Sequence, residues 1–371
     1  MELIHGGDWA GQKERLGNRS IRDFSANVSP LGVPDGVREA ICRAAGKIDR
    51  YPDPLCRKLI QKLSEELSCP EEWIVCGNGA ADLIYRLFQA EKPKKVLLTA
   101  PAFAEYEQAA GLVGSRIYFY ELKEEDQFQI QEDILGQITP DTDLVFLCEP
   151  NNPTGQCTKH SLLTAILERC RECSALLVLD ECFLEFLPDR KERTLLPYLG
   201  QYPNLVILRA FTKLYAMAGV RLGYCVCSDA KRKEQLMESG QPWGVSLLAQ
   251  EAGETLAGSR GKLKPNHIQS AALFQHLLHH AAEVDVEVQQ PLIHRDVCIS
   301  GDAHDVLFQH LLLAEQLLSK VQQHIGGEEN LAPLVDGEDV VGWQLGEGHK
   351  AQPDVVGFVG QNRNDKRFLV F

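Results

Sequence analysis

Two cations eight positions apart, Lys213 and Arg221, stand in a stretch that is otherwise small and apolar. Phe211, Leu214 and Tyr215 flank the lysine. Because desolvation lowers the pKa of a lysine, a lysine in such surroundings can lose its proton. The neutral amine can then form a Schiff base with a carbonyl compound. The stretch also fits a simpler interpretation, in which Lys213 extends its amino group into water from a strand end.

A glycine-containing turn at residues 77–82, with the sequence GNGAAD, follows an apolar run and begins a helical pattern. Glycines let the backbone approach an anion closely, and the free N–H groups at the start of a helix bind phosphate. Such turns are common in front of helices, so this one alone is a weak indication of a phosphate site.

Two further polar motifs follow apolar runs. In residues 149–156, EPNNPTGQ, two prolines restrict the backbone on either side of two asparagines, which is more rigidity than a plain turn needs. Asp180 ends the run 176–179, where a carboxylate is costly unless it meets a cation. The partner could be a metal ion, an arginine or a protonated ring nitrogen. Glu181 is adjacent, but no histidine accompanies the pair, so we expect no metal site.

Together these motifs offer a phosphate site, an amide, a carboxylate, a lysine and an arginine. Pyridoxal 5′-phosphate requires such a set, because its phosphate needs the glycine turn and the arginine, its aldehyde the lysine, and its ring nitrogen the carboxylate. The sequence therefore predicts this cofactor.

The elements that position these residues are short apolar runs alternating with helical patterns. This alternation predicts an α/β fold with a mostly parallel seven-stranded sheet, helices on both faces, and ligands at the carboxyl ends of the strands. The expected strands are 73–76, 96–99, 116–120, 143–148, 175–180, 205–209 and 223–227. The expected helices are 34–45, 55–67, 80–89, 103–113, 130–138, 160–173 and 229–238.

Three regions are expected along the chain. Residues 1–33 read as an N-terminal arm without a regular element, and residues 34–258 as the large cofactor-binding domain. Residues 259–371 differ in character, because nine of the eleven histidines lie there and eleven of the twelve cysteines lie before them. A helix at 305–324 is expected from leucine spacing. We weigh two hypotheses for this region, an out-of-frame translation and a diverged small domain.

Composition narrows the function classes. A net charge of −14 argues against a nucleic-acid-binding protein, which would show a basic stripe. No apolar run approaches the roughly 20 residues that cross a bilayer, and the first residues do not resemble a signal peptide, so we expect a cytoplasmic protein without a membrane partner. The cysteines are scattered in the sequence, which favours reduced thiols over disulfides or a metal site.

The order GNGAAD, EPNNPTG, LDE and FTKLYAMAGVRLGY resembles the fold-type I pyridoxal-phosphate enzymes of the class I/II aminotransferase group. Within that group, residues 1–258 are similar to the threonine-phosphate decarboxylases of cobalamin synthesis and to the histidinol-phosphate aminotransferases. The arm favours the decarboxylases, because HGG at 5–7 and DFSANVSPLG at 23–32 resemble them closely. The aminotransferases usually carry NENP at the second place.

The resemblance implies that Lys213 forms the Schiff base and that Asp180 pairs with the pyridine nitrogen. Asn152 would contact the ring hydroxyl O3′ and Phe103 the ring face. The residues implied for the phosphate are Gly79, Ala80, Thr212, Arg221 and, from the other subunit of a homodimer, Tyr51. The residues implied for the substrate are His5, Gly6, Asn27 and Asn152.

The activity implied is decarboxylation of O-phospho-L-threonine to aminopropanol phosphate, in cobalamin biosynthesis. One alternative is a histidinol-phosphate aminotransferase, which uses the same residues but aligns a different Cα bond. Another is a catalytically impaired cofactor-binding dimer. Two departures from the family bear on this. Phe183 stands where many relatives have a tyrosine that binds O3′, and the arginines after residue 260 lie in no family motif.

Overall fold

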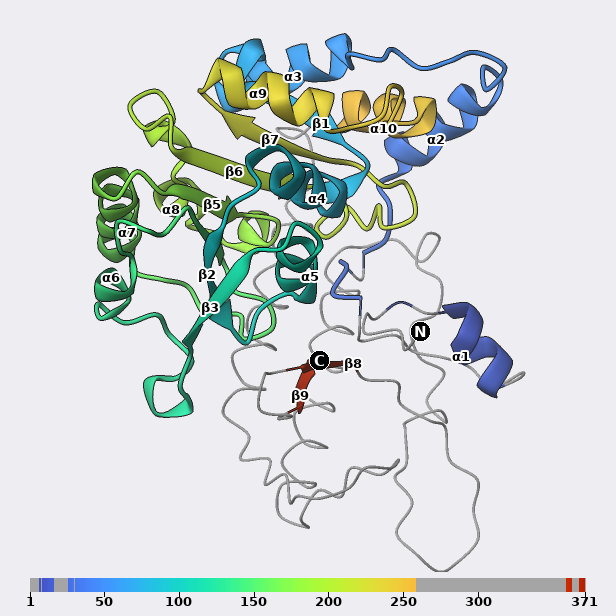
Figure 1. The fold of residues 1–371 in the computed structure, drawn as a ribbon. Coiled ribbons are helices and arrows are strands. Elements are labelled where there is room, and N and C mark those ends of the chain that lie inside the picture. The colour runs from blue at the N-terminus through green and yellow to red at the C-terminus, as the bar shows by residue number, and fades with distance from the viewer. Residues whose placement is uncertain are drawn as a thin grey trace, which may run out of the picture. The chain divides into compact units, whose positions relative to one another are not determined.

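The computed structural model describes residues 7, 9–16, 26–29, 31–257, 358–361 and 367–370 (Figure 1). The chain divides into two compact units. One contains Val28–Ala272 and carries the seven-stranded sheet; the other contains Met1–Asn27. The expected helix at 305–324 lies outside the described residues, as does most of the region after residue 258. Within that region β8 (Phe358–Gln361) and β9 (Arg367–Val370) pair as a two-stranded sheet.

The large sheet has the strand order β1-β7-β6-β5-β4-β2-β3. Strand β7 runs antiparallel to both its neighbours, and the remaining pairs are parallel. The seven strands are β1 (Ile74–Gly77), β2 (Lys95–Ala100), β3 (Arg116–Glu121), β4 (Leu144–Cys148), β5 (Leu176–Asp180), β6 (Leu205–Ala210) and β7 (Gly223–Cys227). This architecture confirms the predicted fold class.

The central strands are apolar throughout because both faces of the sheet are covered. Every residue of β4, β5 and β7 is buried. Alternate strand residues on one face join side chains of α4, α5 and α9 in a single core, while their neighbours face the other way. Continuous apolar runs rather than alternating ones are therefore what this sheet requires.

Most of the expected helices form within one or two residues of their predicted bounds. They are α2 (Asp35–Ala45), α3 (Arg57–Leu67), α4 (Gly79–Glu91), α5 (Ala104–Leu112), α7 (His160–Glu172) and α9 (Ala230–Glu238). The helix expected at 130–138 is reduced to α6 (Ile134–Gln137). There the N–H of Gln131 donates to the hydroxyl of Tyr120 at 3.2 Å rather than to a helical carbonyl. A short helix α8 (Arg190–Arg193) follows β5.

Besides α8, two longer helices form among the described residues where none was expected. Helix α1 (Trp9–Leu16) lies in the arm, in a stretch rich in good helix formers such as Ala, Gln, Lys and Glu. Helix α10 (Leu247–Ala257) packs against α2 and α3. A Cβ on Gly253 would lie 2.5 Å from the Leu222 side chain, so this packing depends on a glycine.

The carboxyl ends of six strands, all but β7, lie at the end of the sheet where β7 begins. Backbone hydrogen bonds connect the segments there. The N–H of Glu149 donates to the carbonyl of Asp180 at 2.8 Å, and the N–H of Phe211 donates to the carbonyl of Leu222 at 3.1 Å. This edge brings together the glycine turn, the 149–158 loop, Asp180 and the 211–222 loop, as the predicted sheet requires.

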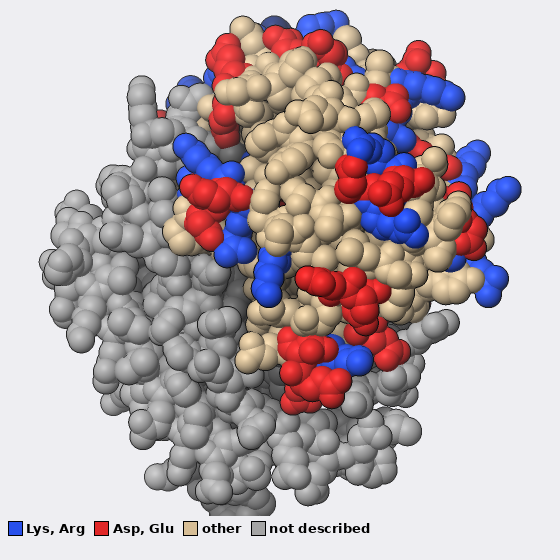
Figure 2. Space-filling model, turned by 90° about the vertical axis from the view of Figure 1, so that its left-hand side faces the viewer, with Lys and Arg blue, Asp and Glu red and all other residues tan. Residues whose placement is uncertain are grey.

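The described surface carries both signs of charge. On the face in Figure 2, Lys and Arg side chains are interleaved with Asp and Glu side chains. Within the described ranges, no helix has the length and apolarity to span a membrane. The described cysteines are free thiols, and most of them are buried.

Candidate active site

Lys213 lies in the 211–222 loop, which connects the end of β6 to the start of β7. Its side chain is half-buried, and its Nζ lies 5.2 Å from the centroid of the Phe183 ring. Burial is the largest cause that lowers the pKa of Lys213, and the charge of Arg221 lowers it further, against the opposing effect of Cys182 and Asp180. A lysine that simply reached into water would not be desolvated in this way. The geometry therefore favours a reactive amine.

The main chain of Lys213 is held by Ser29, from the last part of the N-terminal segment 1–33, and by its own loop. The N–H of Ser29 donates to the backbone carbonyl of Lys213 at 2.9 Å. The N–H of Ala216 donates to the same carbonyl at 3.2 Å. Because both bonds are made by the main chain, the loop holds its position whatever state the lysine side chain is in.

Asp180 ends β5 and is only 4% exposed. Its Oδ1 accepts a hydrogen bond from the N–H of Cys182 at 2.9 Å, and its Oδ2 accepts one from the hydroxyl of Tyr106 at 2.7 Å. Both donors are neutral. The carboxylate is therefore oriented by the protein while its negative charge stays available to a cation. Tyr106 was not expected from the sequence, since no spacing rule links it to a residue 74 positions away.

The guanidinium of Arg221 lies against the glycine turn at the start of α4. Gly79 begins α4 with φ +80°, and a Cβ there would lie 2.6 Å from Nη2 of Arg221. A Cβ on Gly223 would lie 2.6 Å from the backbone nitrogen of Ala80. The guanidinium thus lies against the start of a thirteen-residue helix, whose first N–H groups have no helical acceptor. This combination suits a phosphate dianion.

The 149–158 loop is fastened by the first of its two asparagines. Asn151 is buried, and its Nδ2 donates to the carbonyl of Pro101 at 3.2 Å and to Oγ1 of Thr154 at 3.0 Å. Its backbone closes the turn through Gly155 N to Asn151 O at 2.7 Å. Asn152 is half-buried. The anchoring of Asn151 fixes the backbone beside Asn152, the residue predicted to contact the cofactor.

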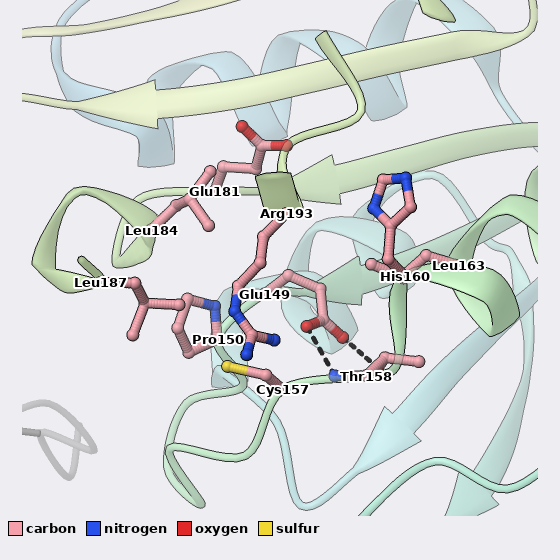
Figure 3. A pocket seen from close by; sticks show the side chains of 10 residues that line it. All are labelled: Glu149, Pro150, Cys157, Thr158, His160, Leu163, Glu181, Leu184, Leu187 and Arg193. Atoms are coloured by element: carbon pink, nitrogen blue, oxygen red, sulfur yellow. Dashed lines mark hydrogen bonds between the residues drawn. The ribbon is translucent and has the colours of Figure 1, made fainter. Parts of the chain in front are cut away.

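A small cavity of about 10 Å³ lies beside this loop, and Glu149 is one of the residues that line it (Figure 3). The buried Glu149 carboxylate accepts hydrogen bonds from both the N–H and the hydroxyl of Thr158, the former at 2.9 Å. Burial raises the pKa of Glu149 to about 7, although these two donors counteract it. In Figure 3 the Arg193 side chain lies beside Pro150 and Cys157. Glu149 thus joins the two ends of the loop that carries Asn152.

The start of α5 adds two residues to the site. Phe103, predicted to contact the cofactor ring, precedes α5 and meets the Tyr106 ring edge-on with centroids 5.6 Å apart. Glu105 is buried, and burial raises its pKa to about 7 against the charges of Lys213 and Arg221. The sequence did not single out Glu105. A carboxylate one residue before Tyr106 carries no motif of its own.

The remaining predicted residues are placed as follows. Tyr51 is 79% exposed and its ring lies 4.6 Å from that of Trp243. Thr212 is half-buried between β6 and Lys213. Asn27 has φ 50°, and its Oδ1 is buried with no hydrogen-bond partner among the described residues. His5 and Gly6 lie outside the described residues.

These groups fit the predicted cofactor. Gly79 leaves room for the guanidinium of Arg221, which a side chain at that position would displace. The buried carboxylate of Asp180 receives only neutral donors from the described residues. The amine of Lys213 has a lowered pKa. A pyridinium ring with an aldehyde and a phosphate ester complements all three.

Residues 19–322 match the family described as aminotransferase class I and II. The threonine-phosphate decarboxylase of Salmonella typhimurium is 40% identical over 234 residues, which cover 63% of this chain and 64% of the relative. The chain therefore matches slightly less than two thirds of the length of that relative.

Two other similarities bear on the fold and on the choice of reaction. Histidinol-phosphate aminotransferase 1 of Cupriavidus pinatubonensis is 31% identical over 251 residues, covering 67% of this chain and 66% of the relative. The crystal structure of histidinol-phosphate aminotransferase from Sinorhizobium meliloti, in complex with pyridoxal-5′-phosphate, superposes with a TM-score of 0.66 at 24% identity. That superposition covers 77% of this chain and 76% of the other, and it supports the fold.

Proposed function

The chain belongs to the aminotransferase class I and II family, and on this premise we propose that it decarboxylates O-phospho-L-threonine to aminopropanol phosphate. The observation that carries the proposal is the half-buried Lys213, with its lowered pKa, close to the buried Asp180. The choice of substrate is supported by the 40% identity to a threonine-phosphate decarboxylase and by the arm residues that resemble that group. The product would then serve cobalamin biosynthesis.

Pyridoxal 5′-phosphate is the cofactor of this family and of this chain. When bound, it supplies an aldehyde that condenses with amines and a ring that accepts the electrons of a breaking bond at the substrate Cα. Lys213 would hold the aldehyde carbon through Nζ, and Asp180 would keep the proton on the ring nitrogen. Gly79, Ala80, Thr212 and Arg221 would bind the phosphate, Phe103 would cover the ring face, and Asn152 would reach O3′.

The chain's own residues have three tasks in the proposed reaction. The first is to place the carboxylate of the substrate perpendicular to the ring, because the bond in that position is the one that breaks. We assign this task to substrate contacts from His5, Gly6 and Asn27. The second would fall to Asp180, which would keep the proton on the ring nitrogen of the cofactor. The third would fall to Lys213, whose Nζ would take up a proton from the ammonium group of the substrate and donate it to Cα in place of the departing carbon dioxide.

We also propose a homodimer. Tyr51 is 79% exposed in the single chain, which leaves its hydroxyl available to a second copy. In the proposed dimer, Tyr51 of the partner subunit reaches the phosphate bound by Arg221.

Incubation of the protein with pyridoxal phosphate and O-phospho-L-threonine tests the proposal. We expect release of carbon dioxide and stoichiometric formation of aminopropanol phosphate, and an absorbance band near the visible edge in the cofactor-loaded protein. In Lys213→Ala this band should be lost and turnover should fall by about 10⁴-fold or more, because the nucleophile and proton donor is gone. A wild-type band without any turnover would instead indicate a cofactor-binding protein without this activity.

The alternative function is transamination of histidinol phosphate, which the 31% identity to an aminotransferase of that substrate supports. Transamination breaks the Cα–H bond instead and leaves the amino group on the cofactor. Formation of pyridoxamine phosphate from histidinol phosphate, with no carbon dioxide from phosphothreonine, would favour this function over decarboxylation.

A further inference from the structure

Tyr106 is a fully buried tyrosine that joins three elements of the site. It lies on α5 and is 1% exposed. Its hydroxyl donates to Oδ2 of Asp180 at the end of β5, at 2.7 Å. Its ring stacks on Phe146 of β4, with centroids 4.0 Å apart and an interplanar angle of 26°. Both ends of the side chain are therefore fixed, which determines where the hydroxyl points.

The direction of this hydrogen bond is also fixed. Burial, followed by the charge of Asp180, raises the pKa of Tyr106 well above its ordinary value, so the phenol keeps its proton. Tyr106 is then always the donor and Asp180 always the acceptor. A donor to a carboxylate stabilises its ionised form, and hydrogen bonds to charged groups are about twice as strong as neutral ones.

The second donor to Asp180 is the main-chain N–H of Cys182, which no side-chain change removes. Tyr106 therefore contributes the side-chain hydrogen bond that orients Oδ2 of this carboxylate. The other titratable groups near the pair are Cys148 on β4, Cys182 after β5, Glu105 on α5 and Lys213. Burial raises the pKa of both thiols well above their usual value, so they stay neutral.

Tyr106 also touches the other residue predicted to contact the cofactor ring. Phe103 meets the edge of the Tyr106 ring with an interplanar angle of 78°. One side chain thus supports both the partner of the ring nitrogen and the group expected on the ring face.

We propose that Tyr106 is a positioning residue that orients the Asp180 carboxylate toward the pyridine nitrogen of the cofactor. The proposal rests on the cofactor part of the proposed function and is independent of the substrate. Its consequence is that the hydroxyl of Tyr106 governs how firmly the ring nitrogen keeps its proton. A positive charge on the pyridine nitrogen disfavours a proton on the nitrogen that joins Lys213 to the cofactor. If the pyridine nitrogen holds its proton less firmly, the pKa of the lysine-linked nitrogen should therefore rise.

The test compares Tyr106→Phe with Tyr120→Phe. Tyr120, on strand β3, offers a matched control. Its hydroxyl donates to a different carboxylate, and the distance to Oδ1 of Asp133 is 2.5 Å. Each variant is loaded with pyridoxal phosphate, and two quantities are measured by absorbance. One is the Kd of the apoprotein for the cofactor. The other is the pH midpoint at which the band of the lysine-bound cofactor changes.

In Tyr106→Phe we expect the Kd to rise roughly tenfold and the pH midpoint to move upward by about half a unit or more. In Tyr120→Phe neither should change, although both variants lose a tyrosine–aspartate hydrogen bond and some stability. An unchanged midpoint in Tyr106→Phe, with normal cofactor uptake by the wild type, would overturn the proposal. Absence of cofactor uptake by the wild type would instead contradict the proposed function itself.

A double-mutant cycle with Asp180→Asn separates positioning from general destabilisation. If Tyr106 acts through the carboxylate, Tyr106→Phe should shift the midpoint in the wild-type background and leave it unchanged in the Asp180→Asn background. An equal shift in both backgrounds would show that the tyrosine acts by another route and would also overturn the proposal.

Discussion

Asp180 and Glu181 are consecutive carboxylates at the end of β5, and both are almost fully buried, at 4% and 1% exposure. Their surroundings are opposite in kind. Glu181 accepts two hydrogen bonds from the guanidinium of Arg209, at 3.0 and 2.6 Å, and further bonds from Thr194 and from the N–H of Leu195. Among the described residues, Asp180 accepts hydrogen bonds only from the neutral donors Tyr106 and Cys182.

The difference shows how one strand end can carry both a structural and a chemical carboxylate. Consecutive side chains at a strand end point to opposite sides, so each enters a different environment. A buried charge is costly unless a cation and hydrogen bonds compensate it. The protein supplies that cation for Glu181 in Arg209. For Asp180 we propose that a bound pyridinium would supply it, so that Asp180 serves a ligand while Glu181 belongs to the framework.

The largest effect that would test this comparison is on activity. Asp180→Asn should lower turnover by roughly 10³- to 10⁴-fold, because the amide cannot hold the ring proton through a charge. Its free energy of unfolding should stay within about 1 kcal/mol of wild type, since the change removes a buried charge whose two hydrogen bonds, among the described residues, come from neutral donors. Steady-state kinetics and denaturant unfolding of the apoprotein measure the two effects. A large loss of stability would mean that Asp180 is structural as well.

The matched change at the neighbour, Glu181→Gln, should do the reverse. Removing one partner of a buried ion pair leaves the Arg209 guanidinium undercompensated, and we expect a loss of about 3–5 kcal/mol in the free energy of unfolding. Glu185, with an oxygen 3.3 Å from Nη1 of Arg209, limits the loss. Turnover per folded, cofactor-loaded molecule should remain within a few-fold of wild type. If activity falls as far as in Asp180→Asn, the division between the two carboxylates does not hold.

A third buried carboxylate, Glu149, extends the comparison through a smaller effect, the pH dependence of the free energy of unfolding. The folded-state pKa of Glu149 is raised from 4.5 to about 7, so its contribution to stability is fully present below pH 4.5 and is lost as the pH rises through 7. Glu149→Gln cannot lose a proton. The fall in unfolding free energy from pH 5 to pH 8 should therefore be about 2–3 kcal/mol smaller than in wild type.

Glu105, whose pKa is also raised to about 7, stays in both proteins and serves as the internal reference for this titration. Urea unfolding at pH 5 and at pH 8 gives the comparison. Equal pH dependence in the two proteins would show that Glu149 is ionised across the range and that its carboxylate is as well compensated as that of Glu181.

Several parts of the fold and the site were predictable because the signal was local. Apolar runs such as Leu176–Asp180 specify strands, and six of the seven predicted helices in this domain formed close to their expected bounds. Lys213 and Asp180 stood out because charged residues at the ends of apolar runs are costly. The family membership confirms the resemblance that these motifs carried.

Other features depend on contacts between distant parts of the chain. Helix α10 is fixed by packing on α2 and α3, including a hydrogen bond from Gln250 to the carbonyl of Asp53, 197 positions away. The helix expected at 130–138 is shorter than predicted, and at its expected start the N–H of Gln131 donates to the hydroxyl of Tyr120 from strand β3. Neither of these long-range contacts leaves a periodic signal in the local sequence.

The sequence by itself determined which chemistry is available at this site. The types and order of the glycine turn, the asparagine loop, Asp180 and Lys213 already specify a cofactor with a phosphate, a carbonyl and a basic ring nitrogen. Only the tertiary structure decided which neighbours modify those groups. It placed Tyr106 on Asp180 and Arg209 on Glu181, and it made Asn151 the anchor of the loop that carries Asn152. The reason is physical, since the charge of a buried group depends on every donor and cation around it, and the fold draws these from segments far apart in the chain.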